Sequence, residues 1–126
     1  MTKTAITSPE LAPPVGPFSQ AIRIDDFVYL SGQVGQDPAT GGLVAGGIVA
    51  ETERVFKNLE SVLKAAGRSF DDVVRAGVFL TDMGDFAAMN GVYSKHFSQP
   101  FPARTTIAVA ALPLGASVEI DLVVKA

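Results

Sequence analysis

Apolar residues follow two different periods along the chain, and each period predicts one kind of element. Strict alternation, the two-residue period of a half-buried strand, occurs over residues 20–25 and 117–125. Over residues 48–66 the period lengthens to three and four residues, which is typical of an amphipathic helix. Its apolar stripe comprises Val55, Phe56, Leu59, Val62, Leu63 and Ala66. Gly67 follows directly and predicts the end of this helix.

Three more strands and a second helix are expected from the remaining apolar segments. The strands cover residues 27–31, 73–81 and 104–111, where branched and aromatic residues gather. The helix covers residues 85–97, because its apolar residues again follow helical spacing. The order of strands, helix, strand, helix and strands favours an α+β fold in which a mixed sheet carries two helices on one face.

The N-terminal segment, residues 1–17, contains four prolines and predicts an irregular, partly extended lead-in. It lacks the apolar core of a signal peptide. No apolar run in the chain approaches the length of a membrane span. We therefore expect a soluble cytoplasmic protein without a membrane partner. The length of 126 residues predicts a single domain that covers residues 1–126.

Composition restricts the chemistry that the chain can perform. The absence of cysteine excludes disulfides, thiolate zinc sites and cysteine nucleophiles. The single histidine, His96, forms no metal-binding pattern and is expected at the surface near the end of the second helix. The net charge of −3 argues against a protein that neutralises many phosphates, so no nucleic-acid partner is expected.

One arginine and two carboxylates stand on strands that otherwise resemble core. Arg104 precedes Thr105 and Thr106, and its planar guanidinium matches a carboxylate bidentately. This arginine is either a surface residue that bridges to an acidic neighbour or part of a carboxylate cradle. Glu119 and Asp121 share one face of the last strand. They form either a solvated edge or a site in which a single glutamate acts on a water molecule.

A simple hairpin between the last two strands would separate these charged groups. If residues 112–116 form its loop, Arg104 faces Val124, and Glu119 lies about 17 Å away at the rise of a strand. Arg104 and Glu119 of one chain would then not share a small ligand. A site that uses both would take them from different subunits. The apolar character of the outer sheet face also favours an oligomer.

Four sequence blocks resemble the signature blocks of the RidA (YjgF) family in order and spacing. They are Gly16-Pro17-Phe18-Ser19-Gln20-Ala21, Leu30-Ser31-Gly32-Gln33, Phe101-Pro102-Ala103-Arg104 and Val118-Glu119-Ile120. The resemblance covers nearly the whole chain, and as a set these motifs are specific.

The resemblance implies a chorismate-mutase-like fold with a six-stranded sheet, and a homotrimer whose sheets face a central barrel and whose clefts lie between subunits. It implies hydrolysis, without cofactor or metal, of reactive 2-enamine and 2-imine acids to 2-keto acids and ammonia. The implied substrates are 2-aminoacrylate, 2-iminopropanoate and 2-iminobutanoate. By the same resemblance, Arg104 holds the substrate carboxylate and Glu119 activates the attacking water. The residues implied to line or cover the cleft are Phe18, Ser31, Asn90 and Thr106.

Two positions depart from the family pattern. Active members usually carry tyrosine where this chain has Phe18, so one hydrogen bond, worth about 0.5–1.5 kcal/mol, is missing. Position 106, often cysteine, is threonine, whose backbone serves equally. The phenylalanine leaves open a non-catalytic trimer that binds small carboxylates as a sensor or protein partner. Some relatives are described as ribonucleases or translation inhibitors, an activity that the acidic charge and the single histidine disfavour.

Overall fold

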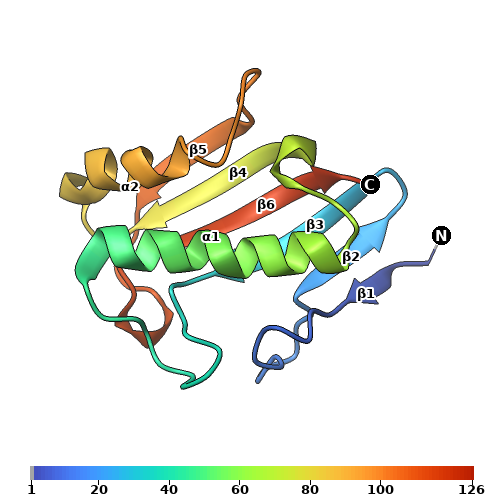
Figure 1. The fold of residues 1–126 in the computed structure, drawn as a ribbon, viewed down its shortest axis with the longest axis horizontal. Coiled ribbons are helices and arrows are strands. Elements are labelled where there is room, and N and C mark those ends of the chain that lie inside the picture. The colour runs from blue at the N-terminus through green and yellow to red at the C-terminus, as the bar shows by residue number, and fades with distance from the viewer. Residues whose placement is uncertain (1) are drawn as a thin grey trace.

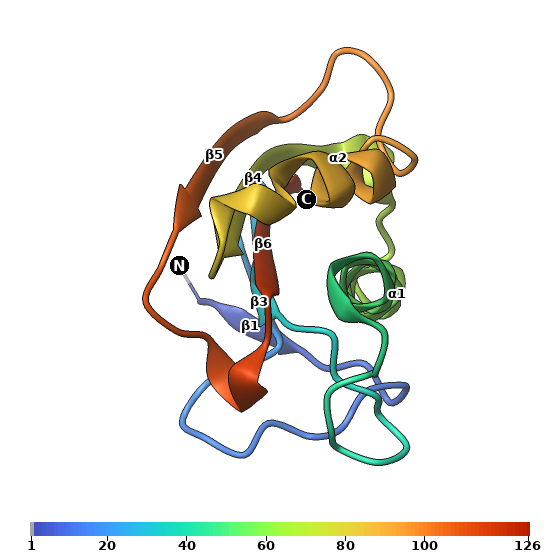
Figure 2. The same ribbon diagram turned by 90° about the vertical axis from the view of Figure 1, so that its left-hand side faces the viewer.

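A six-stranded mixed sheet with two helices on one face forms the frame of the protein in a computed structural model that describes residues 2–126 (Figures 1 and 2). The strands are β1 (Thr4–Ile6), β2 (Ala21–Ile24), β3 (Phe27–Gln33), β4 (Val73–Leu80), β5 (Ala103–Ala108) and β6 (Val118–Lys125). The helices are α1 (Gly47–Ala65) and α2 (Phe86–Tyr93), and short 3₁₀ turns cover Phe70–Asp72, Met83–Asp85 and Pro113–Gly115.

The strand order across the sheet is β1-β2-β3-β6-β4-β5. Every neighbouring pair is antiparallel except β4 and β5, which run parallel. A parallel pair needs a crossover connection, and α2 provides it by packing back onto the sheet beside α1 (Figure 2). The predicted α+β architecture is therefore confirmed.

The core lies between β6 and the apolar stripe of α1. Alternate residues of β6 are fully buried beneath the helices, as the clean alternation of its sequence predicts; they are Val118, Ile120, Leu122 and Val124. The end of α1 also follows the prediction. Gly67 adopts a φ of 70°, and the next N–H, that of Arg68, donates to the Leu63 carbonyl at 2.9 Å. From β2, Arg23 donates to the Ala66 carbonyl at 2.6 Å and further satisfies this helix end.

The hairpin expected between the last two strands does not form. β4 lies between β5 and β6 and pairs with both, parallel to the first and antiparallel to the second. The reason lies in the side chains of the two strands. β6 alternates cleanly between branched apolar residues and others, so it is buried at the centre of the sheet, whereas the polar β5 occupies an edge.

The irregular, partly extended lead-in expected over residues 1–17 is confirmed, and its extended part is Thr4–Ile6, which pairs with β2. Two other expectations need correction. The second helix ends at Tyr93 rather than at position 97, since the N–H groups of Lys95 and His96 turn back to carbonyls only three residues earlier. His96 is not a solvated surface residue: its ring stacks on Phe56 at a centroid distance of 4.2 Å.

The sheet face away from the helices remains open in the single chain. Four large apolar side chains are exposed on it, with exposed fractions between 39% and 47%; they are Phe27, Tyr29, Val74 and Ile107. An apolar face of this kind is typical of a surface that another subunit covers. No helix within residues 2–126 combines the length and the apolar character needed to cross a membrane.

Candidate functional site

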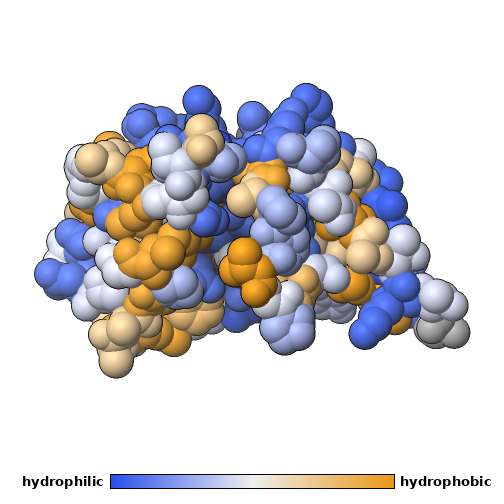
Figure 3. All heavy atoms as spheres, turned by 90° about the horizontal axis from the view of Figure 1, so that it is seen from below, coloured by the Kyte–Doolittle hydropathy of each residue, from blue (hydrophilic) through white to orange (hydrophobic). Residues whose placement is uncertain are grey.

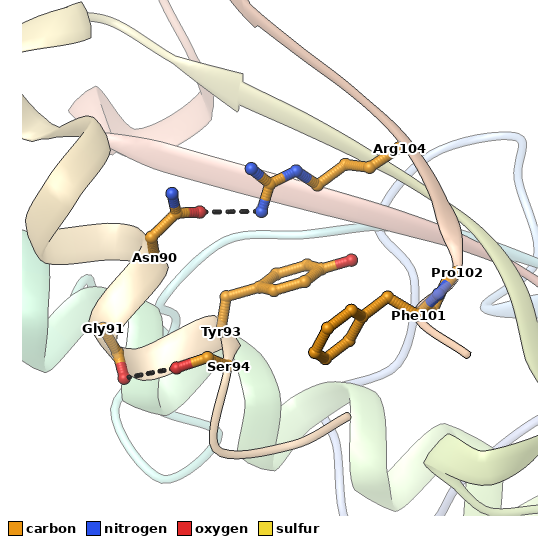
Figure 4. A pocket seen from close by; sticks show the side chains of 7 residues that line it. All are labelled: Asn90, Gly91, Tyr93, Ser94, Phe101, Pro102 and Arg104. Carbon is orange, nitrogen blue, oxygen red and sulfur yellow. Dashed lines mark hydrogen bonds between the residues drawn. The ribbon is translucent and has the colours of Figure 1, made fainter. Parts of the chain in front are cut away.

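A cavity of about 450 Å³ opens between α2 and the start of β5, and Arg104 lies in its wall (Figure 4). The seven residues that line it are Asn90, Gly91, Tyr93, Ser94, Phe101, Pro102 and Arg104. Arg104 is thus the one charged residue of the lining. The cavity joins two of the sequence-predicted residues, Arg104 and Asn90, which stand on different elements.

Arg104 is held from several sides by the helix that it faces. Its Nη1 donates a hydrogen bond of 2.7 Å to Oδ1 of Asn90 (Figure 4). Its Cζ lies 4.6 Å from the centre of the Tyr93 ring and 5.5 Å from that of Phe86. Within residues 2–126 no carboxylate pairs with this guanidinium, since the ion pair that the structure records there joins Lys64 to Glu10. The guanidinium is therefore fixed in place with donors left for an anionic ligand.

A second cavity, of about 360 Å³, has Phe18 and Glu119 in its lining. Several of the segments that line it are loops, which lie at the lower end of the ribbon in Figure 1. The N-terminal loop contributes prolines and Phe18. The loop that follows β3 contributes Val34 and Gln36, and the 3₁₀ turn before β6 contributes Leu114. Seen from this end, the molecule presents several patches of hydrophobic surface among hydrophilic residues (Figure 3). Phe18 and Leu114 are 55% and 54% exposed, so apolar groups form the rim.

Glu119 is half-buried on the open face of the sheet, beside Gly32 of β3. A Cβ at position 32 would lie 2.8 Å from Cδ of Glu119 and closer still to Oε2, so only glycine leaves this carboxylate its space. Burial raises the pKa of the Glu119 carboxyl, and the nearby carboxylate of Asp121 raises it further. A carboxylate with a raised pKa is a stronger base than an ordinary glutamate.

Asp121, the second carboxylate of this face, is occupied by the backbone. Its Oδ1 accepts a hydrogen bond of 3.1 Å from the N–H of Gly77. Burial raises its pKa, while the Gly77 N–H and the charge of Arg75 oppose that effect. The two neighbouring carboxylates therefore differ in character, since no residue within 2–126 donates a recorded hydrogen bond to the Glu119 carboxylate.

Ser31 and Thr106 line neither of the two cavities. The Ser31 hydroxyl donates to the carbonyl of Ser19 at 2.6 Å and so fixes the segment that carries Phe18. Thr106 follows Arg104 by two residues on β5 and pairs with Val78 of β4, so it shares the helix-facing side of the sheet. Both residues thus lie near a cavity in sequence and in space, without forming its wall.

Arg104 and Glu119 of one chain point to opposite sides of the sheet. Arg104 lies beside Ala76 of β4, whereas Glu119 lies beside Phe79, three residues further along that strand. With one strand between them, their Cα atoms are roughly 14 Å apart. The expectation that one chain cannot offer both groups to a small ligand therefore holds, although the hairpin from which it was argued does not form.

Sequence reasoning missed two residues of this arrangement. Tyr93 is one of the residues whose spacing predicts the second helix and carries no predicted role in the site, yet its ring lies under Arg104. Phe86, Asn90 and Tyr93 stand at i, i+4 and i+7, and this spacing on one helix face was the available signal. Gly32 lies inside a strand, where glycine often marks a close approach of another group.

Metal chemistry finds no support in the donor arrangement of residues 2–126. No three side chains drawn from the single histidine, the aspartates and the glutamates of these residues come together as a metal site. The two cavities contain one arginine and one glutamate as their charged groups, which suits an organic anion and a water molecule better than a cation.

Known proteins resemble this chain over nearly its whole length. Residues 9–126 match the family model described as Endoribonuclease L-PSP. Protein DfrA of Myxococcus xanthus is 48% identical over 125 residues, covering 98% of this chain and 95% of that protein. The 2-iminobutanoate/2-iminopropanoate deaminase of Capra hircus is 45% identical over 123 residues, covering 98% of this chain and 90% of that protein.

Solved structures share the whole fold. RidA from the Antarctic bacterium Psychrobacter sp. PAMC 21119 has a TM-score of 0.92 at 42% identity, covering 98% of this chain and 99% of that one. Escherichia coli TdcF with bound serine has a TM-score of 0.89 at 29% identity, covering 98% of each chain. With the family model matched over most of its length, the chain belongs to the RidA (YjgF) family.

Proposed function

We propose that this protein is a cofactor-free deaminase that hydrolyses reactive 2-enamine and 2-imine acids to 2-keto acids and ammonia. The observation that carries the proposal is that, in the part of the chain that the structure describes, Arg104 is held in a fixed orientation without an anionic partner. Its guanidinium lies in a cavity wall, is held by Asn90 at 2.7 Å and lacks a carboxylate partner within residues 2–126. A 2-imino acid offers the carboxylate that such a fork binds bidentately. The deaminases named among its relatives support the same reaction.

The complete site is proposed to lie between two copies of the chain in a homotrimer. One copy contributes the Arg104 cavity, and the next contributes the cavity that contains Phe18 and Glu119. Within one chain, Arg104 and Glu119 are roughly 14 Å apart and lie on opposite faces of the sheet. Residues from two different copies would not be subject to this separation and could face the same ligand. The apolar open faces of the sheets would surround a central barrel, as in chorismate-mutase-like folds, and would be covered there.

In the proposed reaction, Arg104 fixes the carboxylate, so that the imine carbon next to it faces a water molecule at Glu119. A 2-enamine first takes a proton from solvent at its terminal carbon and so becomes the protonated imine. The oxygen of the water bonds to the carbon of the protonated imine, Glu119 takes one proton of that water, and the C=N electron pair stays on nitrogen as the lone pair of an amine. Glu119 then returns its proton to this nitrogen. The C–N bond breaks as the C=O bond forms, and the hydroxyl proton leaves with the ammonia as ammonium. One water is consumed and one 2-keto acid and one ammonia are released, with no change of oxidation state.

The chemistry needs little beyond binding and orientation. The carbon of a protonated imine is already electrophilic, so neither a metal nor a covalent nucleophile is required. Burial of Glu119 raises its pKa, which improves it as a base toward water. Phe18 would cover the planar substrate, and Asn90 would keep Arg104 in position. Ser31 and the backbone of Thr106 would complete the walls once the second copy is in place.

The test is a turnover assay with 2-iminopropanoate generated in the cuvette by an amino acid oxidase. The protein should accelerate the release of pyruvate and ammonia. Arg104→Ala should lower kcat/KM about 100-fold or more, because two charge-assisted hydrogen bonds of about 1.5–3 kcal/mol each are lost. A wild-type rate no greater than the uncatalysed one, or an unchanged rate in Arg104→Ala, would disprove the proposal.

A second candidate is a non-catalytic trimer that binds small carboxylates. The specific observation in its favour is Phe18, which lacks the hydroxyl usual at this position in active members. One solved relative, TdcF of Escherichia coli, was determined with bound serine. Tight binding of 2-oxobutanoate together with no acceleration of any imine tested would favour this candidate over the enzyme.

A further inference from the structure

The aromatic ring beneath Arg104 is the feature of the site that its proposed chemistry leaves unexplained. Tyr93 is 6% exposed, and its ring centre lies 4.6 Å from Cζ of Arg104. A guanidinium at this distance is attracted to the face of the ring. In Figure 4 the guanidinium extends from β5 above the ring, while Asn90 approaches it from the side. The ring and the amide therefore restrain the fork in two different directions.

The ring itself is immobilised by the core. Phe97 packs against it at a centroid distance of 4.6 Å, and Phe56 meets it edge-on at 5.8 Å. Phe56 is 1% exposed, so this cluster is continuous with the core under α1. The position of the guanidinium is thus coupled through Tyr93 to the most rigid part of the molecule.

The hydroxyl of Tyr93 lies near Arg104 but forms no well-aligned hydrogen bond. Its oxygen is buried and has no recorded partner of good geometry within residues 2–126. Burial raises the pKa of Tyr93, and the nearby Arg104 opposes that rise. A buried hydroxyl without a well-aligned partner costs stability. The face of the ring is therefore the better-placed contact with Arg104, and a variant without the hydroxyl separates the two.

We propose that Tyr93 is a positioning residue whose ring, not its hydroxyl, holds the Arg104 guanidinium ready for a carboxylate. The inference rests on the proposed function, because it assumes that Arg104 binds the substrate carboxylate. Phe86, at 5.5 Å from Cζ, is a weaker second contact from the same helix face. The spacing of Phe86, Asn90 and Tyr93 places all three side chains on the face of α2 that contacts Arg104.

The test compares Tyr93→Phe, which keeps the ring, with Tyr93→Leu, which removes it. Binding of 2-oxobutanoate is measured by calorimetry or NMR titration, and turnover of 2-iminopropanoate is measured alongside. Tyr93→Leu should raise the Kd and the KM about 3- to 30-fold, with kcat within about twofold, since binding of ground and transition states is lost equally. Tyr93→Phe should bind as wild type and unfold at the same temperature or higher.

The matched control is Phe70→Leu, which removes a ring of the same cluster that packs on Phe56 and Phe97 but has no recorded contact with Tyr93 or Arg104. It should lower the Tm and leave the Kd for 2-oxobutanoate unchanged. If Tyr93→Leu does not fold, phenylalanines bearing one, two and three fluorines are placed at position 93. They weaken the negative face of the ring with little change in shape, so the Kd should rise stepwise with fluorine number.

The outcomes separate this inference from the proposed function. Equal losses in Tyr93→Phe and Tyr93→Leu, or a Kd independent of ring fluorination, would overturn the role of the ring while Arg104→Ala still abolishes binding. If Arg104→Ala binds 2-oxobutanoate as wild type does, the proposed function fails and the inference fails with it.

Discussion

Gly32 of β3 leaves the space in which the Glu119 carboxylate of β6 lies. A Cβ at position 32 would stand 2.8 Å from Cδ of Glu119, closer than real side-chain contacts allow. Gly77 of β4 relates to Asp121 in the same way, with its added Cβ 3.2 Å from Cγ of that residue. The two strands that flank β6 therefore each provide a glycine that leaves space for one carboxylate on the open face of the sheet.

Gly32→Ala should displace the Glu119 carboxylate and lower turnover of 2-iminopropanoate about 100-fold, comparable to losing a general base. Gly32 lies where the pairing of β3 with β6 shifts register, but its φ is not in the left-handed region that favours glycine, so the fold should be kept, with the free energy of unfolding changed by about 1 kcal/mol. Steady-state kinetics and urea unfolding test both parts.

Gly77→Ala is the matched control for that substitution. It crowds the other carboxylate, Asp121, to which no catalytic role is assigned. Turnover should stay within about threefold of wild type, the range of a small change in the charge near Glu119. Equal losses in the two variants would show that crowding of the sheet, not displacement of Glu119, lowers the rate.

Glu119→Gln should stabilise the protein at neutral pH while it abolishes turnover. Burial raises the pKa of Glu119, so the folded state holds the proton more tightly than the unfolded chain. Ionisation of Glu119 therefore destabilises the fold as the pH rises above the ordinary glutamate pKa of about 4.3 and through the raised value. The free energy of unfolding should therefore be larger for the variant than for the wild type at about pH 7, and this difference should vanish by about pH 4. Urea unfolding across this range measures it, and an excess that grows as the pH falls would contradict the assignment.

Phe18→Tyr should increase kcat/KM about 2- to 10-fold, the value of one added hydrogen bond of about 0.5–1.5 kcal/mol. Phe18 is exposed in the same cavity as Glu119, so a hydroxyl there would reach a bound substrate or its water. The measurement is a comparison of several amino-acid-derived imines. A rate that falls on restoring the hydroxyl would mean that this chain has adapted its cleft to the phenyl ring.

Asn58→Ala should loosen the wall of the Glu119 cavity. The Asn58 side chain is 1% exposed, and its Nδ2 donates to the carbonyls of Val34 and Gln36 at 3.2 and 3.0 Å. Removal leaves the Gln36 carbonyl without its recorded donor and removes the acceptor of Arg54 Nε, while the Val34 carbonyl keeps the N–H of Gln36. It should cost about 1–3 kcal/mol of stability. Ser61→Ala, one turn further along α1, removes a hydroxyl at the surface that bonds the Lys57 carbonyl of its own helix and the Glu10 carboxylate. The cost of this substitution should be about 1 kcal/mol or less.

The sequence predicted the elements well where one local signal decides the outcome. The stripe of α1 and its stop at Gly67 are set by spacing and by a single residue that tolerates positive φ. The Arg104–Asn90 contact was not predicted as such, but both residues were singled out and they meet at 2.7 Å.

What the sequence did not predict depends on which strands pair. Nothing local to β5 and β6 states that β4 lies between them, because strand pairing is decided by burial across the whole sheet. Tyr93 resembled any core residue of an amphipathic helix, since its contact with Arg104 exists only once β5 is placed beside α2. The grouping of Arg104 with Asn90 and of Phe18 with Glu119 in two cavities likewise follows from topology.

The central claim, that Arg104 of one copy and Glu119 of another act on one substrate, is tested most directly by mixing two inactive variants. Arg104→Ala and Glu119→Gln are purified, combined in equal amounts and allowed to exchange subunits by unfolding and refolding together. In a trimer with sites between neighbours, each mixed assembly contains one site with both residues intact, so activity should recover to about a quarter of the wild-type value. No recovery, although mass spectrometry shows mixed assemblies, would contradict the account.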